Sequence, residues 1–292
     1  MNRRALVTGA SGFIAPHLVR RLLADGWEVA LVARSTSRVP EDLLPRTALL
    51  HADVEAAAFT DAVQAFAPGT CFHLATHFVG VHDLADIDPL IAANLTLGTR
   101  LAEALSAQRG ATFVNVGTIW QHHESRRYGP TSLYAATKQA FADVLQFYAE
   151  CTPLRVVTLE LSDTYGPDDR RTKLLQLLVR AHRTGEPLSL SPGQQRIDLV
   201  HVADVVAALL RAHDLADADA PAYSVSGTVL PLREFVALVG ELLGATVPVQ
   251  WGARPYRARE MMTPWRYSPP LPDWRPAVDL REGLAAVLAQ MA

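Results

Sequence analysis

A tyrosine and a lysine four residues apart, Tyr134 and Lys138, carry the clearest chemistry in this sequence of 292 residues. They stand in the segment 133–145, which has helical character, so both side chains would lie on one face, one turn apart. A free tyrosine titrates near about pH 10, and a nearby ammonium lowers that pKa. Such a pair makes a usable proton donor or acceptor. Taken alone, the pattern also fits a surface tyrosine and a solvated lysine, so the elements around it must decide.

A hydroxyl group precedes this segment at the end of a predicted strand. Residues 111–116 have the pattern of a buried strand, and Thr118 follows shortly after it. Its hydroxyl would be well placed to bind a carbonyl oxygen. The adjacent His122 and His123 suggest metal ligands at first sight, but we interpret them as part of a flexible loop on the substrate side. We predict no metal site.

An early glycine-bearing turn joins a short buried strand, residues 4–9, to a helical pattern at residues 17–23. Gly9 allows the tight turn, and Gly12 lets the backbone approach a pyrophosphate at the helix N-terminus, where free N–H groups favour anions. Ala15 takes the third position, where helix packs on strand. An ordinary turn between a strand and a helix is the alternative. The cofactor-binding residues predicted at this turn are Gly9, Ser11, Gly12, Phe13 and Ile14.

The end of the second predicted strand, residues 27–33, bears on the choice of cofactor. Arg34 follows it, and no carboxylate comes before Glu41. In dinucleotide folds an acidic residue here holds the ribose 2′-hydroxyl, whereas an arginine suits a 2′-phosphate. We therefore expect NADP(H) to be preferred, with NAD(H) as a second option, unless Arg34 is only a solvated loop residue.

Further cofactor contacts are expected where the next strands end. The third strand covers residues 48–54, and Asp53 would either reach the adenine amino group or cap the next helix. The fourth covers residues 71–76, whose small side chains fit a backbone lying along the cofactor. Asn94, in the amphipathic helix 94–105, would hydrogen-bond near the nicotinamide end or sit in the helix interior. The residues predicted to bind cofactor here are Asp53, Val54, Leu74, Ala75, Thr76 and Asn94.

Composition limits the class of protein. Apolar residues make up 49% and charged residues 20% of the chain, and the formal net charge is -3, so nothing indicates a nucleic acid partner. We expect no membrane insertion, because no apolar run reaches the roughly 18 residues needed to cross a bilayer. Cys71 and Cys151 lack metal-ligand spacing, and we interpret them as reduced thiols in a cytoplasmic protein.

The order of elements predicts the fold class. Strands alternate with helices from residue 4 to residue 161, which is typical of an α/β protein with a Rossmann-like doubly wound parallel sheet. After Pro167 the pattern changes to helix, proline-rich turns and short strands, which predicts a smaller C-terminal α+β domain for substrate. The expected division is a dinucleotide-binding domain of residues 1–166 and about 196–226, and a substrate domain of about 167–195 and 227–292.

Together these pieces resemble the extended short-chain dehydrogenase/reductase family, also called the NAD-dependent epimerase/dehydratase family, over essentially the whole chain. Residues 8–15 are similar to its cofactor turn, and Tyr134 and Lys138 match its YxxxK pair. Thr118 falls at its Ser/Thr position. Its later signatures are matched by residues 165–167 and 196–204. The resemblance implies an NAD(P)-dependent oxidoreductase that acts on a nucleotide-linked sugar and forms a homodimer.

Four stretches resemble, more narrowly, the CDP-abequose/CDP-paratose synthase-like reductases of deoxysugar biosynthesis: residues 120–122, 133–141, 163–168 and 191–200. This implies NADPH-dependent reduction of the 4-keto group of a CDP- or dTDP-linked 4-keto-6-deoxy or 3,6-dideoxy sugar. Thr118 would hold the carbonyl, Tyr134 would donate the proton, and Lys138 would lower the Tyr134 pKa and bind the nicotinamide ribose. The substrate-binding residues implied are His77, Thr118, Trp120, Thr164, Arg196 and Arg257.

Other interpretations of the same residues stay open. A 4-epimerase would use the same Tyr–Lys pair with tightly held NAD, and a non-catalytic dinucleotide-sensing binder would need neither residue. A 4,6-dehydratase needs an acid and a base after the threonine, and Ile119 and Trp120 supply neither. Arg257 is one of three arginines within six residues, which would clamp a pyrophosphate or only add solubilising charge.

Overall fold

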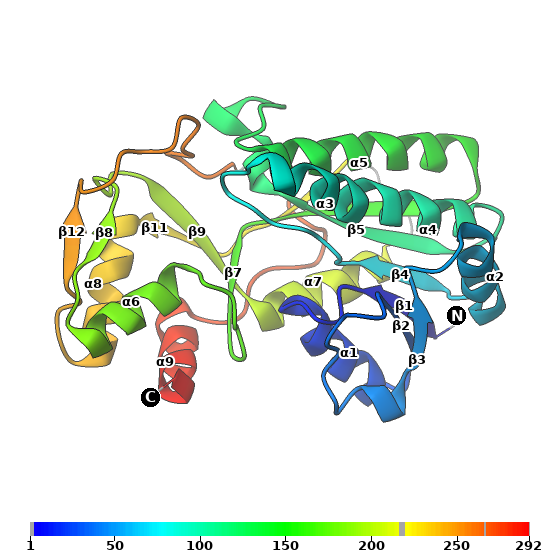
Figure 1. Ribbon diagram of the computed structural model, residues 1–292, viewed down its shortest axis with the longest axis horizontal. Helices are drawn as coiled ribbons and strands as arrows, with labels where there is room; N and C mark the ends of the chain where they lie inside the picture. Colours follow the sequence, from blue (N-terminus) through cyan, green and yellow to red (C-terminus); the bar gives the residue numbers. More distant parts are fainter. Residues whose placement is uncertain (1–2, 216–219, 266, 292) are drawn as a thin grey trace.

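The computed structural model describes residues 3–215, 220–265 and 267–291, and a large parallel sheet forms its centre (Figure 1). Seven strands lie in the order β10-β6-β5-β4-β1-β2-β3, each parallel to its neighbours. Their bounds are β1 (Arg4–Thr8), β2 (Glu28–Ala33), β3 (Ala48–His51), β4 (Thr70–His73), β5 (Thr112–Thr118), β6 (Arg155–Leu161) and β10 (Tyr223–Val225). The predicted doubly wound α/β fold is confirmed.

Helices cover both faces of this sheet (Figure 1). On one face α1 (Ile14–Ala24) packs against α7 (Val202–Asp214), and their apolar sides join β1 and β6 in one core. On the other face α2 (Ala56–Phe66), α4 (Leu97–Ser106) and α5 (Leu133–Cys151) form a second core with the same strands. Because both faces are covered, the central strands are near-continuous apolar runs.

Several predicted elements have different bounds in the structure, among them the fourth strand, which ends at His73 and not at residue 76. The third strand ends at His51, earlier than expected, because Ala52–Asp53 already turn toward Glu55, which begins α2 by accepting two backbone N–H groups of its first turn. The helix expected at 94–105 is part of a longer helical run, α3 (Ile87–Ile91), a π-helical segment (Ala92–Thr96) and α4. Such π segments are frequent at functional sites.

The chain after β6 builds smaller sheets beside the large one (Figure 1). β9 pairs in parallel with β7 and antiparallel with β11, and β8 pairs in parallel with β12. A third apolar core joins these strands to three helices. The bounds are β7 (Asp163–Tyr165), α6 (Leu174–Thr184), β8 (Leu188–Leu190), β9 (Arg196–His201), β11 (Thr228–Pro231), α8 (Leu232–Leu243), β12 (Val249–Trp251) and α9 (Leu280–Met291). None of the helices in the described ranges is long and apolar enough to cross a membrane.

Candidate active site

A cleft of about 860 Å³ runs along the carboxyl ends of the central strands. The strand order changes direction between β1 and β4, and ligands of open α/β sheets bind in the crevice outside such a switch point. The cleft extends from the glycine turn after β1, past the ends of β4 and β5, to Lys173 before α6. Its volume is that of an ordinary cofactor or ligand site.

Thr118, Tyr134 and Lys138 meet in this cleft. Thr118 is the last residue of β5, and α5 presents Tyr134 and Lys138 one turn apart from its start, which Ser132 caps by accepting the N–H of Ala135. The side chains are buried, with 8% of Tyr134 and 3% of Lys138 exposed. Thr76 and Thr118 line the same part of the cleft, and their hydroxyls act on the pKa of Tyr134. A carbonyl oxygen placed there would meet two hydroxyl groups.

The Tyr134 phenol is a protonated group at neutral pH. Burial raises its pKa to about 12, and the nearby Asp163 carboxylate acts in the same direction, while the Thr76 and Thr118 hydroxyls oppose it. The pKa of Tyr134 is raised overall because loss of hydration is the largest effect, and Lys138 is not among the groups that shift it here. That Lys138 lowers this pKa stays a prediction. A neutral phenol is the form required of a proton donor.

Lys138 has no hydrogen bond or ion pair with any residue that the structure describes. Burial lowers the pKa of its ammonium to about 8. A buried cation without a protein partner is costly, and hydroxyl or anionic groups of a ligand would relieve that cost. The ammonium thus fits the ribose of a dinucleotide.

The glycine turn after β1 has the shape of a pyrophosphate site. Gly9 has a positive φ of 77°, and a Cβ there would lie 2.9 Å from the backbone N of Ala75 and the carbonyl C of Leu74. Only glycine therefore lets the β1 and β4 loops approach so closely. Helix α1 begins at Ile14, and no side chain caps its first turn, so its N–H groups are available to an anion. The lining includes Gly9, Ser11, Gly12, Phe13, Ile14, Leu74, Ala75 and Thr76.

Arg34 and Asp53 lie at the far end of the cleft. Arg34 is exposed and lines the cleft beyond β2. The Asp53 carboxylate accepts the N–H and the hydroxyl of Ser35, and these bonds lower its pKa. Since Glu55 caps α2, the capping role considered for Asp53 is wrong. Val54 is exposed and does not line the cleft.

Asn94 lies behind the cleft wall rather than in it. Only 1% of it is exposed, and its side-chain oxygen accepts the Thr76 hydroxyl and the N–H of His77. Its amide nitrogen donates to the His77 carbonyl and to Thr137 on α5. Asn94 thus fixes the loop after β4 against the helix of Tyr134, which is a supporting position that its sequence context did not reveal.

The substrate-side predictions divide into two groups. His77, Trp120 and Thr164 line the cleft. Arg196 and Arg257 do not: the Arg196 guanidinium donates to the Val229 carbonyl, and Arg257 forms a bidentate ion pair with Glu260 over the Trp120 ring. Sequence reasoning missed the lining residues Phe78, Asp163, Arg171 and Lys173. Asp163 stands in a recognised motif, but nothing in the sequence marked Phe78.

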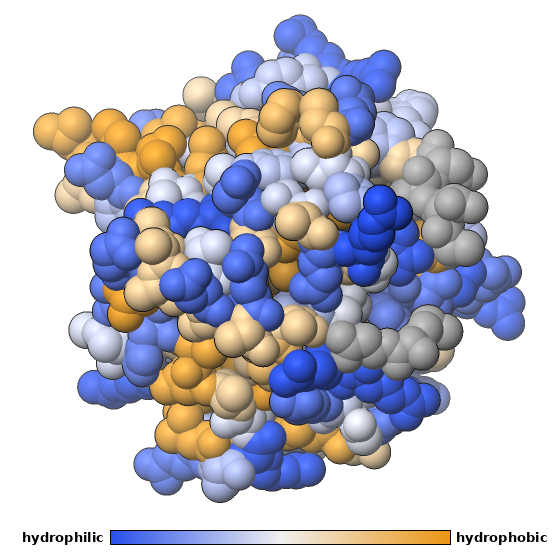
Figure 2. Space-filling view, turned by 90° about the vertical axis from the view of Figure 1, so that its right-hand side faces the viewer, coloured by the Kyte–Doolittle hydropathy of each residue, from blue (hydrophilic) through white to orange (hydrophobic). Residues whose placement is uncertain are grey.

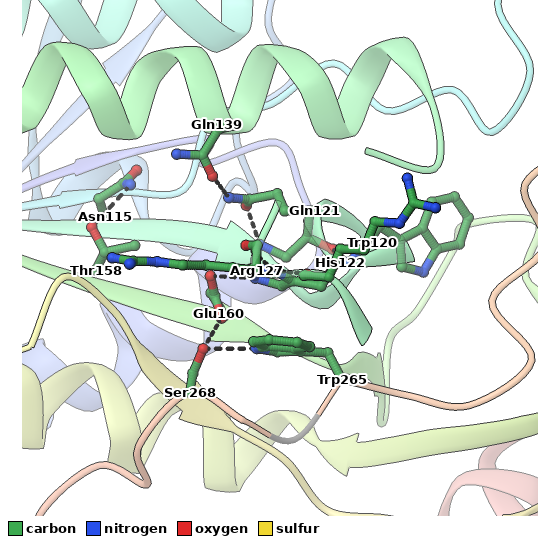
Figure 3. Close-up of polar contacts among 12 residues, drawn as sticks. Asn115, Trp120, Gln121, His122, Arg127, Gln139, Thr158, Glu160, Trp265 and Ser268 are labelled. Carbon is green, nitrogen blue, oxygen red and sulfur yellow. Dashed lines mark hydrogen bonds and ion pairs between the residues drawn. The ribbon is translucent and has the colours of Figure 1, made fainter. Parts of the chain in front are cut away.

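The prediction that His122 lies in a flexible loop is wrong. His122 is 5% exposed, and its Nε2 lies 2.8 Å from Oε1 of Glu160 on β6 (Figure 3). Its Nδ1 lies 2.7 Å from the Arg127 carbonyl oxygen. The ring also stacks on Trp265. These contacts arise from distant parts of the chain, so the local sequence did not indicate them.

A doubly wound sheet with a glycine turn at its switch point and a Tyr–Lys pair in the same cleft defines an NAD(P)-dependent oxidoreductase of the extended short-chain dehydrogenase/reductase type. Residues 5–226 match the NAD dependent epimerase/dehydratase family, and the chain belongs to that family.

The curated relatives include more than one activity. CDP-abequose synthase of Yersinia pseudotuberculosis is 25% identical over 89% of this chain and 91% of its own length. UDP-glucose 4-epimerase of Mycolicibacterium smegmatis is 29% identical over 97% of this chain and 96% of its own. The similarity to these relatives indicates an enzyme of this family that modifies nucleotide sugars, and it does not distinguish reduction from epimerisation.

Solved structures are similar over nearly the whole chain. MoeE5 in complex with UDP-glucose and NAD superposes with a TM-score of 0.82 at 25% identity, covering 99% of this chain and 98% of that one. UDP-glucose 4-epimerase of Thermus thermophilus in complex with NAD has a TM-score of 0.81 at 26% identity, and the match covers 98% of both chains.

Proposed function

We propose that this protein reduces the 4-keto group of a nucleotide-linked 4-keto-6-deoxy or 3,6-dideoxy sugar, with NADPH as reductant. The observation that carries the proposal is the buried Tyr134 phenol beside the Thr118 hydroxyl, with a pKa raised to about 12. Such a group is protonated at neutral pH and lies where a carbonyl oxygen of the substrate could receive its proton. The relatives that act on nucleotide sugars support the substrate class.

Three side chains of the cleft would share the work. The Thr118 hydroxyl holds the carbonyl oxygen, and Tyr134 gives its phenolic proton to that oxygen. Lys138 places a positive charge beside the phenolate that remains, so the charge that develops is met inside a water-poor cleft. When bound, the cofactor supplies the hydride that completes the alcohol.

The sugar would lie among aromatic rings beside Tyr134. Phe78 contacts Tyr134 edge-on at 4.9 Å between ring centroids and contacts Trp120 at 5.5 Å. Both rings line the cleft. An apolar wall of this kind suits a sugar that has lost hydroxyl groups, because it offers no hydrogen bonds to them. We therefore favour deoxy sugars, with CDP or dTDP as the nucleotide.

Dehydration of a nucleotide hexose is not favoured by the site. Ile119 is buried in an apolar cluster with Met261 and Trp265, and Trp120 carries only an indole. Neither supplies the acid or the base that elimination needs after the threonine. Epimerisation remains the alternative, since the epimerase relatives are as similar as the reductases. It would use the same Tyr134 and Lys138 with tightly held NAD, so net consumption of the cofactor distinguishes reduction from epimerisation.

The proposal also includes a preference for NADP, a homodimer and a cytoplasmic location. For the cofactor, Arg34 is exposed at the end of the cleft, which supports contact with a 2′-phosphate. Ile87 and Ile91 on α3 and Phe147 on α5 expose apolar side chains. Figure 2 shows one face of the molecule, on which hydrophobic and hydrophilic residues are mixed. The exposure of these three side chains supports a homodimer through the two helices. The free thiols Cys71 and Cys151 support a cytoplasmic location.

We also propose the two-domain division stated above, with residues 1–166 and about 196–226 binding the dinucleotide. β10 supports it, because this late strand pairs with β6 in the large sheet. β9 belongs to the three-stranded sheet, so the boundary passes through the small sheet.

The test is NADPH oxidation with CDP-, dTDP-, UDP- and GDP-linked 4-keto-6-deoxy sugars, followed by NMR of the product. We expect stoichiometric NADPH consumption and a new C4 alcohol with a CDP or dTDP substrate. Interconversion of C4 epimers without net cofactor consumption would instead establish the epimerase. Formation of a 4-keto-6-deoxy sugar from CDP-glucose or dTDP-glucose and oxidised cofactor would refute our interpretation of the site.

A further inference from the structure

A buried polar cluster lies beside the active-site cleft, and the proposed reaction makes no direct use of it (Figure 3). Glu160 on β6 is the centre of this cluster. One oxygen of its carboxylate faces Nε2 of His122 at 2.8 Å, and the other accepts the Ser268 hydroxyl at 2.6 Å. Ser268 in turn accepts the indole N–H of Trp265 at 2.8 Å. The ring of Trp265 also stacks on the ring of His122, with centroids 4.2 Å apart, so each member of the cluster contacts two others.

The hydrogen positions of the His122–Glu160 pair follow from its neighbours. Nδ1 of His122 faces the carbonyl oxygens of Arg126 and Arg127, which only accept, so Nδ1 carries a hydrogen. Nε2 is then the nitrogen that hydrogen-bonds with the Glu160 carboxyl group. With Ser268 donating to the second oxygen, the buried carboxylate is hydrogen-bonded on both sides. A fully satisfied buried network of this kind makes local geometry unique and rigid.

This cluster joins two segments that are far apart in the sequence. One is the turn after β5, which we count together with the last residue of that strand as residues 118–130; its Thr118 and Trp120 line the cleft. The other we call the C-terminal arm, residues 257–265, 267 and 268. Glu160 belongs to neither segment, but it is the register partner of Gly117, the residue before Thr118. A Cβ at Gly117 would lie 3.4 Å from Cγ of Glu160, so the Glu160 side chain packs beside Gly117.

The C-terminal arm contacts the same turn at further points. Trp265 and Met261 pack on Ile119, the residue between Thr118 and Trp120. Arg257 places its guanidinium 4.5 Å from the centroid of the Trp120 ring. Near the other end of the turn, Arg259 donates to the Pro130 carbonyl at 2.6 Å.

We propose that Glu160 and His122 are positioning residues that clamp the C-terminal arm onto the turn after β5 and thereby fix Thr118 and Trp120 against the substrate. The inference rests on the proposed roles of Thr118 and Trp120 at the carbonyl and the sugar. It assigns no contact with cofactor, because neither residue lines the cleft. Loss of the clamp should impair the reaction of the sugar and leave NADPH binding unchanged.

Two substitutions of Glu160 distinguish the effect of its hydrogen bonds from the effect of its side-chain volume. Glu160→Gln keeps both hydrogen bonds, because the amide N–H can donate to Nε2 of His122 and the amide oxygen can accept from Ser268. Glu160→Leu keeps the volume but breaks both. We expect kcat/KM for the nucleotide sugar to fall by about 100-fold in Glu160→Leu, since a shift of about 1 Å near a reacting group has that effect. Glu160→Gln should stay within about threefold of wild type.

The double variant His122→Leu, Glu160→Leu distinguishes positioning from simple stability. Replacing a buried polar pair by apolar side chains of similar volume often restores stability. We expect Tm to recover toward wild type while kcat/KM stays low. Recovery of both together would show that the pair only stabilises the fold and would overturn the inference. Glu241→Gln, which breaks an exposed ion pair with Arg281 on other helices, is the matched control and should change neither.

Hydrogen exchange of the arm provides a readout that does not depend on the substrate. Backbone amides of residues 257–265 should exchange faster in Glu160→Leu than in wild type, Glu160→Gln or Glu241→Gln. If hydrogen exchange of the arm is unchanged in Glu160→Leu, the inference that Glu160 holds the arm is refuted, even if activity falls. If exchange rises but kcat/KM is unaffected, the positioning role is refuted. If the wild type reduces none of the 4-keto sugars, the proposed function fails, and exchange alone decides whether the clamp exists.

Discussion

The side-chain amide of Gln121 donates to the side-chain oxygen of Gln139 at 2.9 Å, which ties the turn after β5 to helix α5 (Figure 3). The oxygen of the Gln121 amide accepts the backbone N–H of Thr118 at 2.9 Å. One buried side chain therefore sets the position of Thr118 relative to the helix that carries Tyr134 and Lys138. The hydroxyls of Thr118 and Tyr134, to which we assign the chemistry, are thus positioned by an amide that is outside the proposed reaction.

Replacing Gln121 by Leu should lower the free energy of unfolding. The buried N–H of Thr118 would lose its partner, which typically costs about 1–3 kcal/mol. Chemical denaturation of the purified protein measures the change. Gln146→Leu, which removes an exposed bond with Glu150 on α5, is the control and should have little effect. An unfolding free energy equal to wild type in Gln121→Leu would show that Thr118 is held by other contacts.

Tyr134→Phe should abolish most turnover and leave the fold intact. Only the hydroxyl is removed, and general acid catalysis contributes about 10²–10⁴-fold to rate. NADPH binding, measured by fluorescence titration, should be retained. Tyr128→Phe changes an exposed loop residue and should behave as wild type. Steady-state kcat of Tyr134→Phe close to that of Tyr128→Phe would remove Tyr134 from the mechanism.

Lys138→Met should stabilise the protein without cofactor while impairing activity. Burial lowers the Lys138 pKa from 10.5 to about 8, so the folded state holds fewer protons than the unfolded state between these values. Wild-type stability should therefore rise with pH from about 8 to 10.5, and the penalty is fully present below about pH 8. The difference of 10.5 − 8 corresponds to roughly 3 kcal/mol at about 1.4 kcal/mol per pH unit.

Unfolding free energies at pH 7 and pH 10 measure this effect. At pH 7 the unfolding free energy of Lys138→Met should exceed that of the wild type. At pH 10 the difference between the two unfolding free energies should be smaller. Arg180→Met, on an exposed position of α6, is the control for removal of a positive charge. A Lys138→Met variant that is less stable than wild type at pH 7 would mean that the ammonium has a stabilising partner.

Arg34→Ala should reduce the preference for NADPH over NADH. Hydrogen bonds to charged groups contribute about 1.5–3 kcal/mol, and exposure of Arg34 places the effect at the low end. We expect the ratio of kcat/KM for the two cofactors to fall by about tenfold or more. Arg38→Ala, in the same exposed loop, tests whether a second arginine shares the phosphate. Equal use of NADH and NADPH by wild type would contradict the proposed cofactor preference.

Phe147→Glu should weaken self-association. Phe147 is 59% exposed on the outer face of α5, and a carboxylate placed in an apolar interface is unfavourable. Light scattering after size-exclusion chromatography gives the mass of the wild type and the variant. We expect a dimer for the wild type and a shift toward monomer for Phe147→Glu. A monomeric wild type would refute the proposed homodimer.

The sequence by itself determined the features that depend on local period and backbone. Tyr134 and Lys138 share a helix face because they are four residues apart, and Gly9 permits a turn that other residues would strain. The alternation of strands and helices determined the parallel sheet, since strands that follow crossover helices pair in parallel.

Only the tertiary structure decided what surrounds each side chain. His122 became a buried partner of Glu160 because β6 and the C-terminal arm close over it. Arg196 and Arg257 do not line the cleft. The Arg196 guanidinium binds a backbone carbonyl outside it, and the Arg257 guanidinium binds a carboxylate outside it. The pKa of Tyr134 followed burial rather than its neighbour in the sequence. Hydration and partners depend on contacts between distant segments, and no local pattern contains them.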